Sequence, residues 1–225
     1  MNKVAVIVAG GSGSRMGTPV PKQFLELKGK PVLVHTVETF LRAFPDIEII
    51  LVLAPDFILQ GSDLIKRYFE GNNIQIAEGG NSRYHSVQNG LKLFKGEAVI
   101  FVHDAVRCLV TEKLIQRCYQ QALQKGSAVP AVPARDSIRM VEGNKSKAIN
   151  RDNIRIIQTP QTFRSDVILP AFQQPYRDSF TDEATVVESS GKDIFLTEGE
   201  ETNIKITLPA DMLIAEKIIE ERQMA

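Results

Sequence analysis

The sequence predicts an α/β protein in which helices cover both faces of a mostly parallel sheet. Short aliphatic and β-branched runs, which are typical of buried strands, alternate along the first two-thirds of the chain with segments whose apolar residues recur at helical spacing. The 225 residues include 43% apolar but only 7% aromatic ones, which suits the aliphatic core of one such domain. We therefore expect residues 1–225 to form a single domain.

The expected strands are continuous apolar runs that end at glycines or polar residues. They are Val4–Val8, Ile47–Ala54, Ile74–Ala77, Ala98–Val102 and Ala128–Val132. In an open sheet of this kind, ligands bind beyond the carboxyl ends of the strands. Residues 10–17, 79–82 and 104–107 follow three of these ends, which makes them the candidate ligand-binding segments.

The expected helices lie between these strands. From Leu33 to Phe44 apolar residues recur at helical spacing, and Pro45 ends the pattern. Shorter helical patterns cover 64–69 and 87–94. A further helix is predicted to begin after Thr111, which suits an N-cap, and to end before Gly126.

The alternation of strands and helices stops after Pro133. Residues 134–163 are mainly polar and contain short β-like pieces at Ser137–Val141 and Ile154–Gln158. Because this stretch is too small to form its own core, we expect it to project as an arm, and a homodimer formed through the arm is a hypothesis. Beyond it, helical patterns at Val167–Phe172, Asp182–Ser189 and Met212–Arg222 and a strand at Asp193–Thr197 are expected.

Charge and cysteine content narrow the functional classes. The 27 basic residues are balanced by 27 acidic ones, which argues against nucleic acid as a partner. Cys108 and Cys118 belong to no metal-binding motif, and we expect both to be free thiols. No apolar segment has membrane-spanning length, and the N-terminal apolar run stops at Gly10 after six residues, so a cytoplasmic enzyme is expected.

A glycine-rich segment, Val8 to Gly17, follows the first expected strand. Glycines allow backbone N–H groups to approach phosphate oxygens closely. The segment is not a P-loop, since no two of its glycines stand five apart. It also lacks the dinucleotide fingerprint, because Met16 stands where the third glycine belongs. By itself the segment is compatible with either a tight turn or a phosphate site.

Two cations favour the phosphate site. Arg15 lies within the glycine-rich segment, and Lys22 follows it in Pro21-Lys22-Gln23. A triphosphate needs cations both for binding and to offset the charge that develops on departing pyrophosphate. Together with the glycines, these two residues predict a nucleoside triphosphate held for attack at its α-phosphorus.

The motifs of this chain, taken together, carry a family resemblance. The glycine-rich segment and Pro21-Lys22-Gln23 resemble the signature of sugar-phosphate nucleotidyltransferases. Further matching pieces are Gly79-Gly80 with Arg83 and Ser86, His103-Asp104-Ala105-Val106-Arg107, Thr159-Pro160-Gln161, Thr181-Asp182-Glu183 and Asn203-Ile204-Lys205. With these, the chain resembles the 2-C-methyl-D-erythritol 4-phosphate cytidylyltransferase family of the non-mevalonate isoprenoid pathway from Val4 to about Glu216. Two departures are Val106-Arg107-Cys108, where the family often has Ala-Arg-Pro, and Ser137, where a threonine is usual.

The resemblance implies a Rossmann-like fold, Mg²⁺ as cofactor, and CTP and a polyol phosphate as substrates. The catalytic cations implied are Arg15, Lys22 and Lys205. The CTP-binding residues implied are Ala9, Gly10, Gly11, Ser12, Gly13, Gly80, Arg83, Ser86 and Asp104. The residues implied for the polyol phosphate are Asp104, Arg107, Ser137, Arg151, Thr159 and Thr181. By the same resemblance Arg151 would act in the partner subunit's site, and Asp104 would help to position the metal. His103, which has no His or Cys cluster nearby, is interpreted as structural.

The sequence leaves three alternative functions open. Ribitol-5-phosphate cytidylyltransferase shares the chemistry and most of the motifs, and spacing alone does not separate the two acceptors or identify the base. A dinucleotide-dependent oxidoreductase is disfavoured by Met16. A non-catalytic nucleotide-sensing module would have lost its cations, whereas Arg15, Lys22 and Lys205 are all present.

Overall fold

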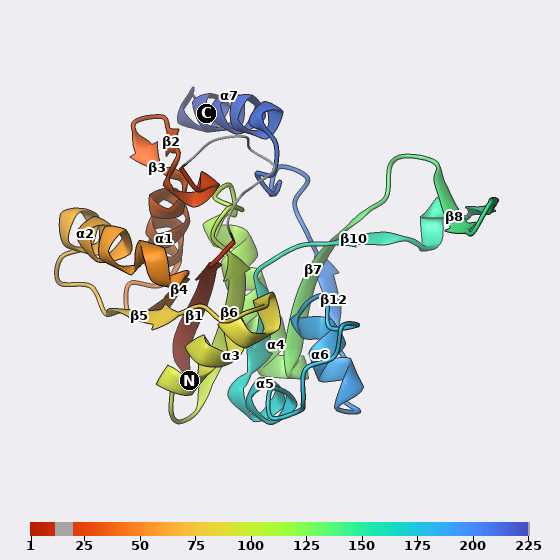
Figure 1. Ribbon diagram of the computed structural model, residues 1–225, viewed down its shortest axis with the longest axis horizontal. Coiled ribbons are helices and arrows are strands. Elements are labelled where there is room, and N and C mark those ends of the chain that lie inside the picture. The colour runs from red at the N-terminus through yellow and green to blue at the C-terminus, as the bar shows by residue number, and fades with distance from the viewer. Residues whose placement is uncertain (12–19, 225) are drawn as a thin grey trace.

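The computed structural model of the protein describes residues 1–11 and 20–224. Its main feature is a sheet of eight strands in the order β10-β7-β11-β6-β1-β4-β5, with β12 also paired to β7 (Figure 1). The strands are β1 (Asn2–Ala9), β4 (Glu48–Leu53), β5 (Ile74–Glu78), β6 (Ala98–Asp104), β7 (Ser127–Pro133), β10 (Arg155–Ile157), β11 (Gln161–Arg164) and β12 (Leu196–Glu198).

The pairing of these strands is mostly parallel. β1 pairs in parallel with β4 and β6, and β4 does so with β5. β12 is parallel to β7, whereas β10 and β11 run antiparallel to their neighbours. Parallel strands need long crossover connections, and here helices supply them. The predicted Rossmann-like α/β fold is confirmed.

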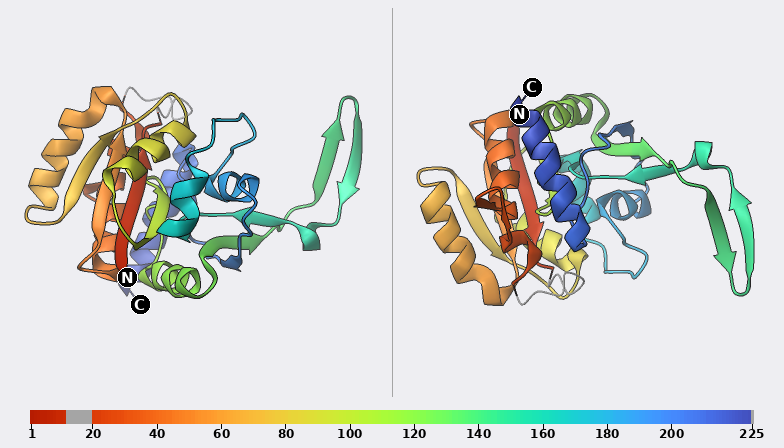
Figure 2. Two further views of the ribbon diagram at one scale, coloured as in Figure 1. Left: turned by 90° about the horizontal axis from the view of Figure 1, so that it is seen from below. Right: turned by 90° about the horizontal axis from the view of Figure 1, so that it is seen from above.

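Helices cover both faces of the sheet (Figures 1 and 2). The helices are α1 (Val32–Ala43), α2 (Ile58–Tyr68), α3 (Arg83–Leu93), α4 (Glu112–Lys125), α5 (Ser165–Ala171), α6 (Glu183–Ser189) and α7 (Pro209–Met224). Because side chains alternate along a strand, Ala5 and Ile7 of β1 join the core formed with α1 and α4. Val4 and Val6 join the core formed with α3, α5 and α6 on the opposite face.

Local capping explains where several helices begin and end. Thr111 accepts a hydrogen bond from the Leu114 N–H at the start of α4, and Gly126 ends that helix with a φ of 87°, as predicted. Asp182 and Thr185 form a reciprocal capping box at the start of α6. Ser82 caps α3 in a similar way by accepting from the His85 N–H.

The projecting arm is shorter than the expected 134–163. Its tip is a hairpin of β8 (Ile138–Glu142) and β9 (Lys145–Ile149), which extends away from the body in both views of Figure 2. β10 returns to pair with β7, and β11 lies between β6 and β7 in the main sheet. The expectation that 161–163 belongs to the arm is therefore wrong, because Phe163 is fully buried in the core.

A third apolar cluster fixes α7 above the carboxyl ends of the strands. Leu27 of β2 (Glu26–Leu27), which pairs with β3 (Lys30–Pro31), packs there with Val106, Ile206 and Ala215.

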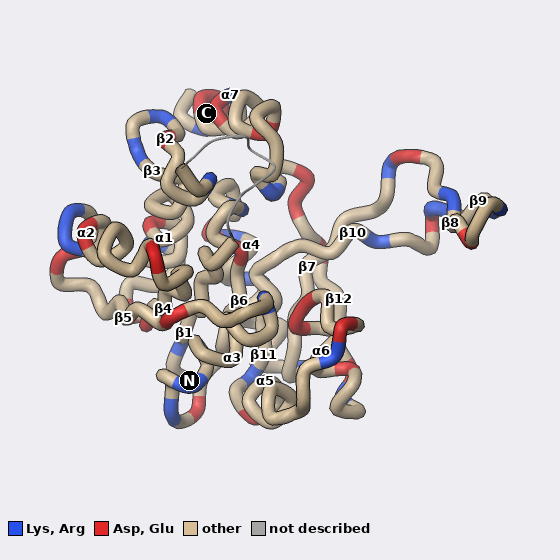
Figure 3. The backbone as a smooth tube through the Cα atoms, in the orientation of Figure 1, with Lys and Arg blue, Asp and Glu red and all other residues tan. Residues whose placement is uncertain are grey.

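Short 3₁₀ turns occur at Lys22–Phe24, Pro55–Phe57 and Arg151–Asn153. Basic and acidic residues are interspersed along the chain (Figure 3). Among residues 1–11 and 20–224, every helix is too short or too polar to span a membrane.

Candidate active site

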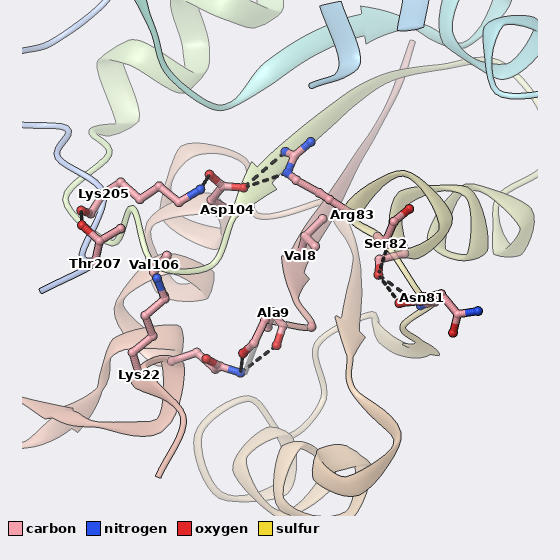
Figure 4. Close-up of a pocket in the computed structure, with 15 residues that line it drawn as sticks. Val8, Ala9, Lys22, Asn81, Ser82, Arg83, Asp104, Val106, Lys205 and Thr207 are labelled. Atoms are coloured by element: carbon pink, nitrogen blue, oxygen red, sulfur yellow. Dashed lines mark hydrogen bonds and ion pairs between the residues drawn. The ribbon is translucent and has the colours of Figure 1, made fainter. Parts of the chain in front are cut away.

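A pocket of about 380 Å³ opens at the carboxyl ends of β1 and β6, where Lys205 and Thr207 of the segment before α7 also line it (Figure 4). It is lined by Val8, Ala9, Gly10, Gly11, Lys22, Gln23, Gly80, Asn81, Ser82, Arg83, Ser86, Asp104, Val106, Lys205 and Thr207. These residues come from four distant parts of the sequence. The fold brings them together at the carboxyl ends of the parallel strands. The position agrees with the rule for ligand sites in open parallel sheets.

Most of the candidate residues within the described ranges meet in this pocket. They are Ala9, Gly10, Gly11, Lys22, Gly80, Arg83, Ser86, Asp104 and Lys205. Ser12, Gly13 and Arg15 lie outside the described residues. Arg107, Ser137, Arg151, Thr159 and Thr181 do not line the pocket.

Gln23 shapes the end of β1. Its buried amide nitrogen donates to the carbonyl oxygens of Ala9, at 2.7 Å, and Gly11, at 3.3 Å. By holding these carbonyls, Gln23 directs the backbone at the start of the glycine-rich segment. The sequence motif includes Gln23 but assigns it no role, since an amide's value as a backbone anchor depends on a fold that the motif does not reveal.

The second glycine pair forms another wall of the pocket. The Gly79 N–H donates to the Leu53 carbonyl at 2.7 Å, and the Gly80 N–H donates to Ser86 Oγ at 3.1 Å. A β-carbon at residue 80 would lie only 2.4 Å from the β-carbon of His85, so this position accepts glycine alone. Ser86 in turn donates to the Ser82 carbonyl at 2.9 Å, which fixes the 79–82 loop.

Asp104, at the end of β6, is the electrostatic centre of the pocket. Its Oδ2 atom lies 2.9 Å from Lys205 Nζ, and its Oδ1 atom accepts hydrogen bonds from Arg83 (Figure 4). Burial alone would raise the pKa of Asp104, but the Arg83 and Lys205 cations outweigh it and hold the pKa well below its usual range. Asp104 is therefore a carboxylate at all physiological pH values.

Two lysines from opposite ends of the chain converge on this pocket. Lys22, which is 9% exposed, donates from Nζ to the Ile206 carbonyl at 2.9 Å. Lys205 lies one residue before Ile206 and contacts Asp104. The 205–207 segment is thus linked to Lys22 through the Ile206 carbonyl and to Asp104 through Lys205, and both lysines line the pocket.

Thr159 and His103 form a buried hydrogen-bond network that holds the backbone of Asp104 in place. The Asp104 N–H donates to Thr159 Oγ1 at 3.1 Å, and the same hydroxyl lies 3.0 Å from His103 Nδ1. Burial lowers the pKa of His103 to about 3, so the ring is neutral. Because Nε2 faces the Arg107 carbonyl at 3.2 Å, it carries the proton, and Nδ1 accepts from Thr159. The interpretation of His103 as structural agrees with this network.

Arg107 does not line the pocket, but its Nε atom lies 3.8 Å from Asp104 Oδ2, and its other contacts are with the backbone. Its Nη1 atom donates to the Asn203 carbonyl at 2.9 Å, and its side chain is 13% exposed. The buried Asn203 side chain donates to the Thr159 carbonyl at 2.9 Å. Arg107 and Asn203 therefore hold the segment that carries Lys205, which is a supporting function that sequence motifs do not distinguish from substrate contact.

The remaining polyol-phosphate candidates are exposed and lie apart from the pocket of their own chain. Ser137 and Arg151 lie at the base of the β8–β9 hairpin, where Arg151 donates to the Arg135 carbonyl at 2.7 Å. Thr181 precedes the capping box of α6.

Asp104 is also the one carboxylate that lines the pocket within residues 1–11 and 20–224. No group of three or more His, Cys, Asp or Glu side chains suited to a metal occurs in that part of the chain. Mg²⁺ in nucleotide sites is commonly held by one or two carboxylates together with substrate phosphates. The donor set therefore fits a magnesium ion that arrives with a nucleotide, and it does not fit a metal cage made by the protein alone.

A glycine-rich strand end facing converging lysines at the edge of a parallel sheet is the architecture of an α/β nucleotidyltransferase. A sequence model of 2-C-methyl-D-erythritol 4-phosphate cytidylyltransferase matches residues 3–221. The chain belongs to this family. It is 42% identical over 219 residues to the cytidylyltransferase of this name from Phocaeicola vulgatus, which covers 97% of this chain and 100% of the relative. It is 43% identical over 220 residues to that of Azobacteroides pseudotrichonymphae, with 97% and 99% covered.

Solved structures agree with this assignment. The 4-diphosphocytidyl-2C-methyl-D-erythritol synthase of Anaerococcus prevotii superposes with a TM-score of 0.83 at 27% identity, covering 97% of this chain and 96% of that one. The 2-C-methyl-D-erythritol 4-phosphate cytidylyltransferase of Francisella tularensis gives 0.80 at 31% identity, with 96% and 99% covered. Membership of this family excludes the dinucleotide-dependent oxidoreductase considered from sequence.

Proposed function

We propose that the protein condenses CTP with 2-C-methyl-D-erythritol 4-phosphate to give 4-diphosphocytidyl-2-C-methyl-D-erythritol and pyrophosphate, in the non-mevalonate isoprenoid pathway. The observation that carries the proposal is the pocket in which Lys22 and Lys205 converge beside Asp104 and the end of β1. It stands in a chain that matches the family over nearly its whole length. As a CTP-dependent biosynthetic enzyme whose two cysteines are free and buried, it would act in the cytoplasm.

The reaction needs neither a covalent intermediate nor a dedicated base. An oxygen of the acceptor's phosphate attacks the α-phosphorus of CTP, and the bond from that phosphorus to the bridging oxygen of the β-phosphate breaks. Pyrophosphate leaves with the electron pair. Since a phosphate monoester has a second pKa of about 6, the nucleophile is already largely dianionic at neutral pH. Positioning and charge stabilisation therefore account for catalysis.

The described cations supply that stabilisation. Lys22 and Lys205 both line the pocket, so they can contact the same α-phosphate. Arg15, which belongs to the glycine-rich segment, is assigned to the phosphates from its sequence position alone. The backbone of Ala9, Gly10 and Gly11, ordered by Gln23, would face the nucleotide, and the Gly80–Ser86 wall would face the base and ribose.

Mg²⁺ fits this site through Asp104 and the phosphates of bound CTP. The ion would neutralise part of the triphosphate charge and favour the departure of pyrophosphate. Asp104 would meanwhile hold Lys205 in the pocket and remain ionised throughout.

The acceptor half of the site is proposed to be completed by a second copy of the chain. The hairpin of the arm exposes Met140 and Val141, which are 47% and 69% exposed, and it has no core of its own. Ser137 and Arg151 lie at the base of that hairpin, outside the pocket of their own chain. In a homodimer joined through the arms, Arg151 would supply a cation to the acceptor phosphate of the partner's pocket.

Pyrophosphate release is expected to require CTP and 2-C-methyl-D-erythritol 4-phosphate together. The assay compares the four nucleoside triphosphates with this acceptor, and then compares the acceptor with ribitol 5-phosphate at saturating CTP. A kcat/KM at least about a hundredfold higher for CTP is expected, since a pocket that pairs with base edges rejects wrong partners strongly. Faster turnover of ribitol 5-phosphate would assign the protein to the alternative acceptor.

A subunit-mixing experiment tests whether Arg151 acts in the partner's site. The Lys22→Ala and Arg151→Ala proteins are each expected to be nearly inactive as homodimers. After subunit exchange, a mixed dimer contains one pocket with both residues intact, so about a quarter of wild-type activity is expected at equal mixing. If exchange is demonstrated by mass spectrometry and activity does not return, Arg151 does not act across the interface.

A further inference from the structure

Glu183 is a buried carboxylate that the proposed reaction leaves without a role. It is the first residue of α6, and it is 1% exposed. The cap of that helix is formed by Asp182 and Thr185, so Glu183 is not needed to begin it. Burial raises the pKa of Glu183, with Arg83 opposing the shift. Because burying a carboxylate is unfavourable unless it is paired, its presence points to a specific partner.

That partner is Arg83, whose guanidinium lies between two carboxylates. Its Nη1 and Nη2 atoms donate to the two oxygens of Glu183, the second at 3.0 Å. Its Nε and Nη2 atoms donate to Asp104 Oδ1 at 3.3 and 3.2 Å. A guanidinium has five N–H groups in a fixed plane, and the two carboxylates take up most of them. Few donors of Arg83 remain for a nucleotide.

Each oxygen of Asp104 consequently has its own cationic partner. Oδ1 is held by Arg83, and Oδ2 is held by Lys205 at 2.9 Å, with Arg107 Nε farther from it at 3.8 Å. Glu183, Arg83, Asp104 and Lys205 therefore form a line of alternating charges, which runs from the start of α6 past the start of α3 to the end of β6 and into the pocket. The rotation of the Asp104 carboxylate is fixed from both sides.

We propose that Glu183 is a positioning residue that holds Arg83 in place and thereby orients Asp104 and Lys205 for transfer. Arg83 is then a support for Asp104 rather than a ligand of the nucleotide. This inference rests on the proposed function, and it assigns a role to the one member of the network that lies farthest from the pocket. Within the Thr181-Asp182-Glu183 motif, the two acidic residues then have different roles. Asp182 caps α6, and Glu183 positions Arg83.

Glu183→Gln should remove the positioning while the protein stays folded. The amide keeps the volume but has one acceptor, and its nitrogen would meet the guanidinium donor to donor. The start of α3, which carries Arg83, is held in place independently of Glu183. The Tyr84 hydroxyl on this helix donates to the carbonyls of Phe172, at 3.2 Å, and Gln174, at 2.5 Å. With Arg83 released, we expect kcat to fall about tenfold or more, because small misplacements of reacting groups are costly. The KM for CTP should change by less than about threefold, since Arg83 does not bind it.

A double-mutant cycle separates positioning from a general structural effect. Arg83→Lys keeps the charge but cannot contact both carboxylates as a fork. If Glu183 acts through Arg83, the double variant should be no slower than the slower single variant, within about threefold. Glu188→Gln, an identical change at an exposed position of α6, is the matched control and should leave kcat within about twofold of wild type.

The outcomes are distinct from those that test the proposed function. Wild-type turnover of CTP with the acceptor tests that function alone, and the ratios of the variants to wild type test Glu183. A folded Glu183→Gln protein with kcat within about twofold of wild type, or multiplicative effects in the double variant, would overturn the inference. If the wild type lacks this turnover, a crystal structure of Glu183→Gln decides. Displacement of Arg83 and Asp104 supports the positioning role, and unchanged side chains refute it.

Discussion

Replacing Lys22 with alanine is expected to lower kcat by about a hundredfold or more while the protein remains folded. Removal of one preorganised donor to a developing negative charge costs on the order of 3 kcal/mol in the transition state. In the unliganded pocket Lys22 Nζ donates to the Ile206 carbonyl, and the loss of a hydrogen bond of this kind costs about 1 kcal/mol of folding stability. The effect should therefore fall on catalysis and not on the fold.

Steady-state kinetics and thermal unfolding, measured on the same preparation, check this expectation. Lys92→Ala is the matched control, because Lys92 is an exposed lysine on α3 that contacts Asn89 rather than the pocket. It should leave both kcat and the melting temperature unchanged. If Lys22→Ala melts like the wild type and still turns over at a near-normal rate, Lys22 has no part in transfer.

The sheet is predictable because its signals are local. β1, β4 and β6 are continuous apolar runs, and their observed bounds lie close to the expected ones. The pattern places β11 in the arm instead of the sheet because Gln161 and Thr162, although buried, are polar. Their burial depends on long-range partners such as the Asp182 carboxylate, which Gln161 contacts at 2.9 Å. No local pattern carries that information.

In the candidate site, too, local sequence motifs predict some features, whereas others depend on contacts between residues far apart in the sequence. Motifs identify Lys22, Asp104 and Lys205, and the fold brings all three to one pocket. The supporting contacts cannot be found in this way. The pairing of Arg83 with Glu183 joins residues 100 positions apart, and the contact of Gln23 with Ala9 depends on how the chain turns after β1. Motifs indicate which residues matter, but geometry is needed to separate those that face a ligand from those that support them.

Asp104→Asn is expected to impair both catalysis and folding. The amide keeps the shape of the side chain but removes the negative charge that Arg83, Lys205 and Arg107 share. Breaking a buried ion pair from one side typically costs about 3 kcal/mol or more. Arg83 keeps Glu183 as a partner, so we expect a loss in the free energy of unfolding near the lower end, about 3 kcal/mol at pH 7. The kcat should fall by about a hundredfold or more, because Lys205 loses its anchor.

The difference in unfolding free energy between wild type and Asp104→Asn is expected to become smaller as the pH falls. The pKa of Asp104 is lowered in the folded protein, so its contribution is fully present above the unfolded-state value of roughly 3.9 and is lost as the pH falls toward the folded-state value. The amide that replaces this carboxylate in the variant does not titrate. The difference in unfolding free energy between wild type and variant should thus be constant from pH 7 to about 5. Below roughly pH 4 it should narrow by about 1.4 kcal/mol per pH unit. Urea unfolding of both proteins between pH 3 and 7 measures it, and a difference that stays constant down to pH 3 would show that the Asp104 charge does not stabilise the fold.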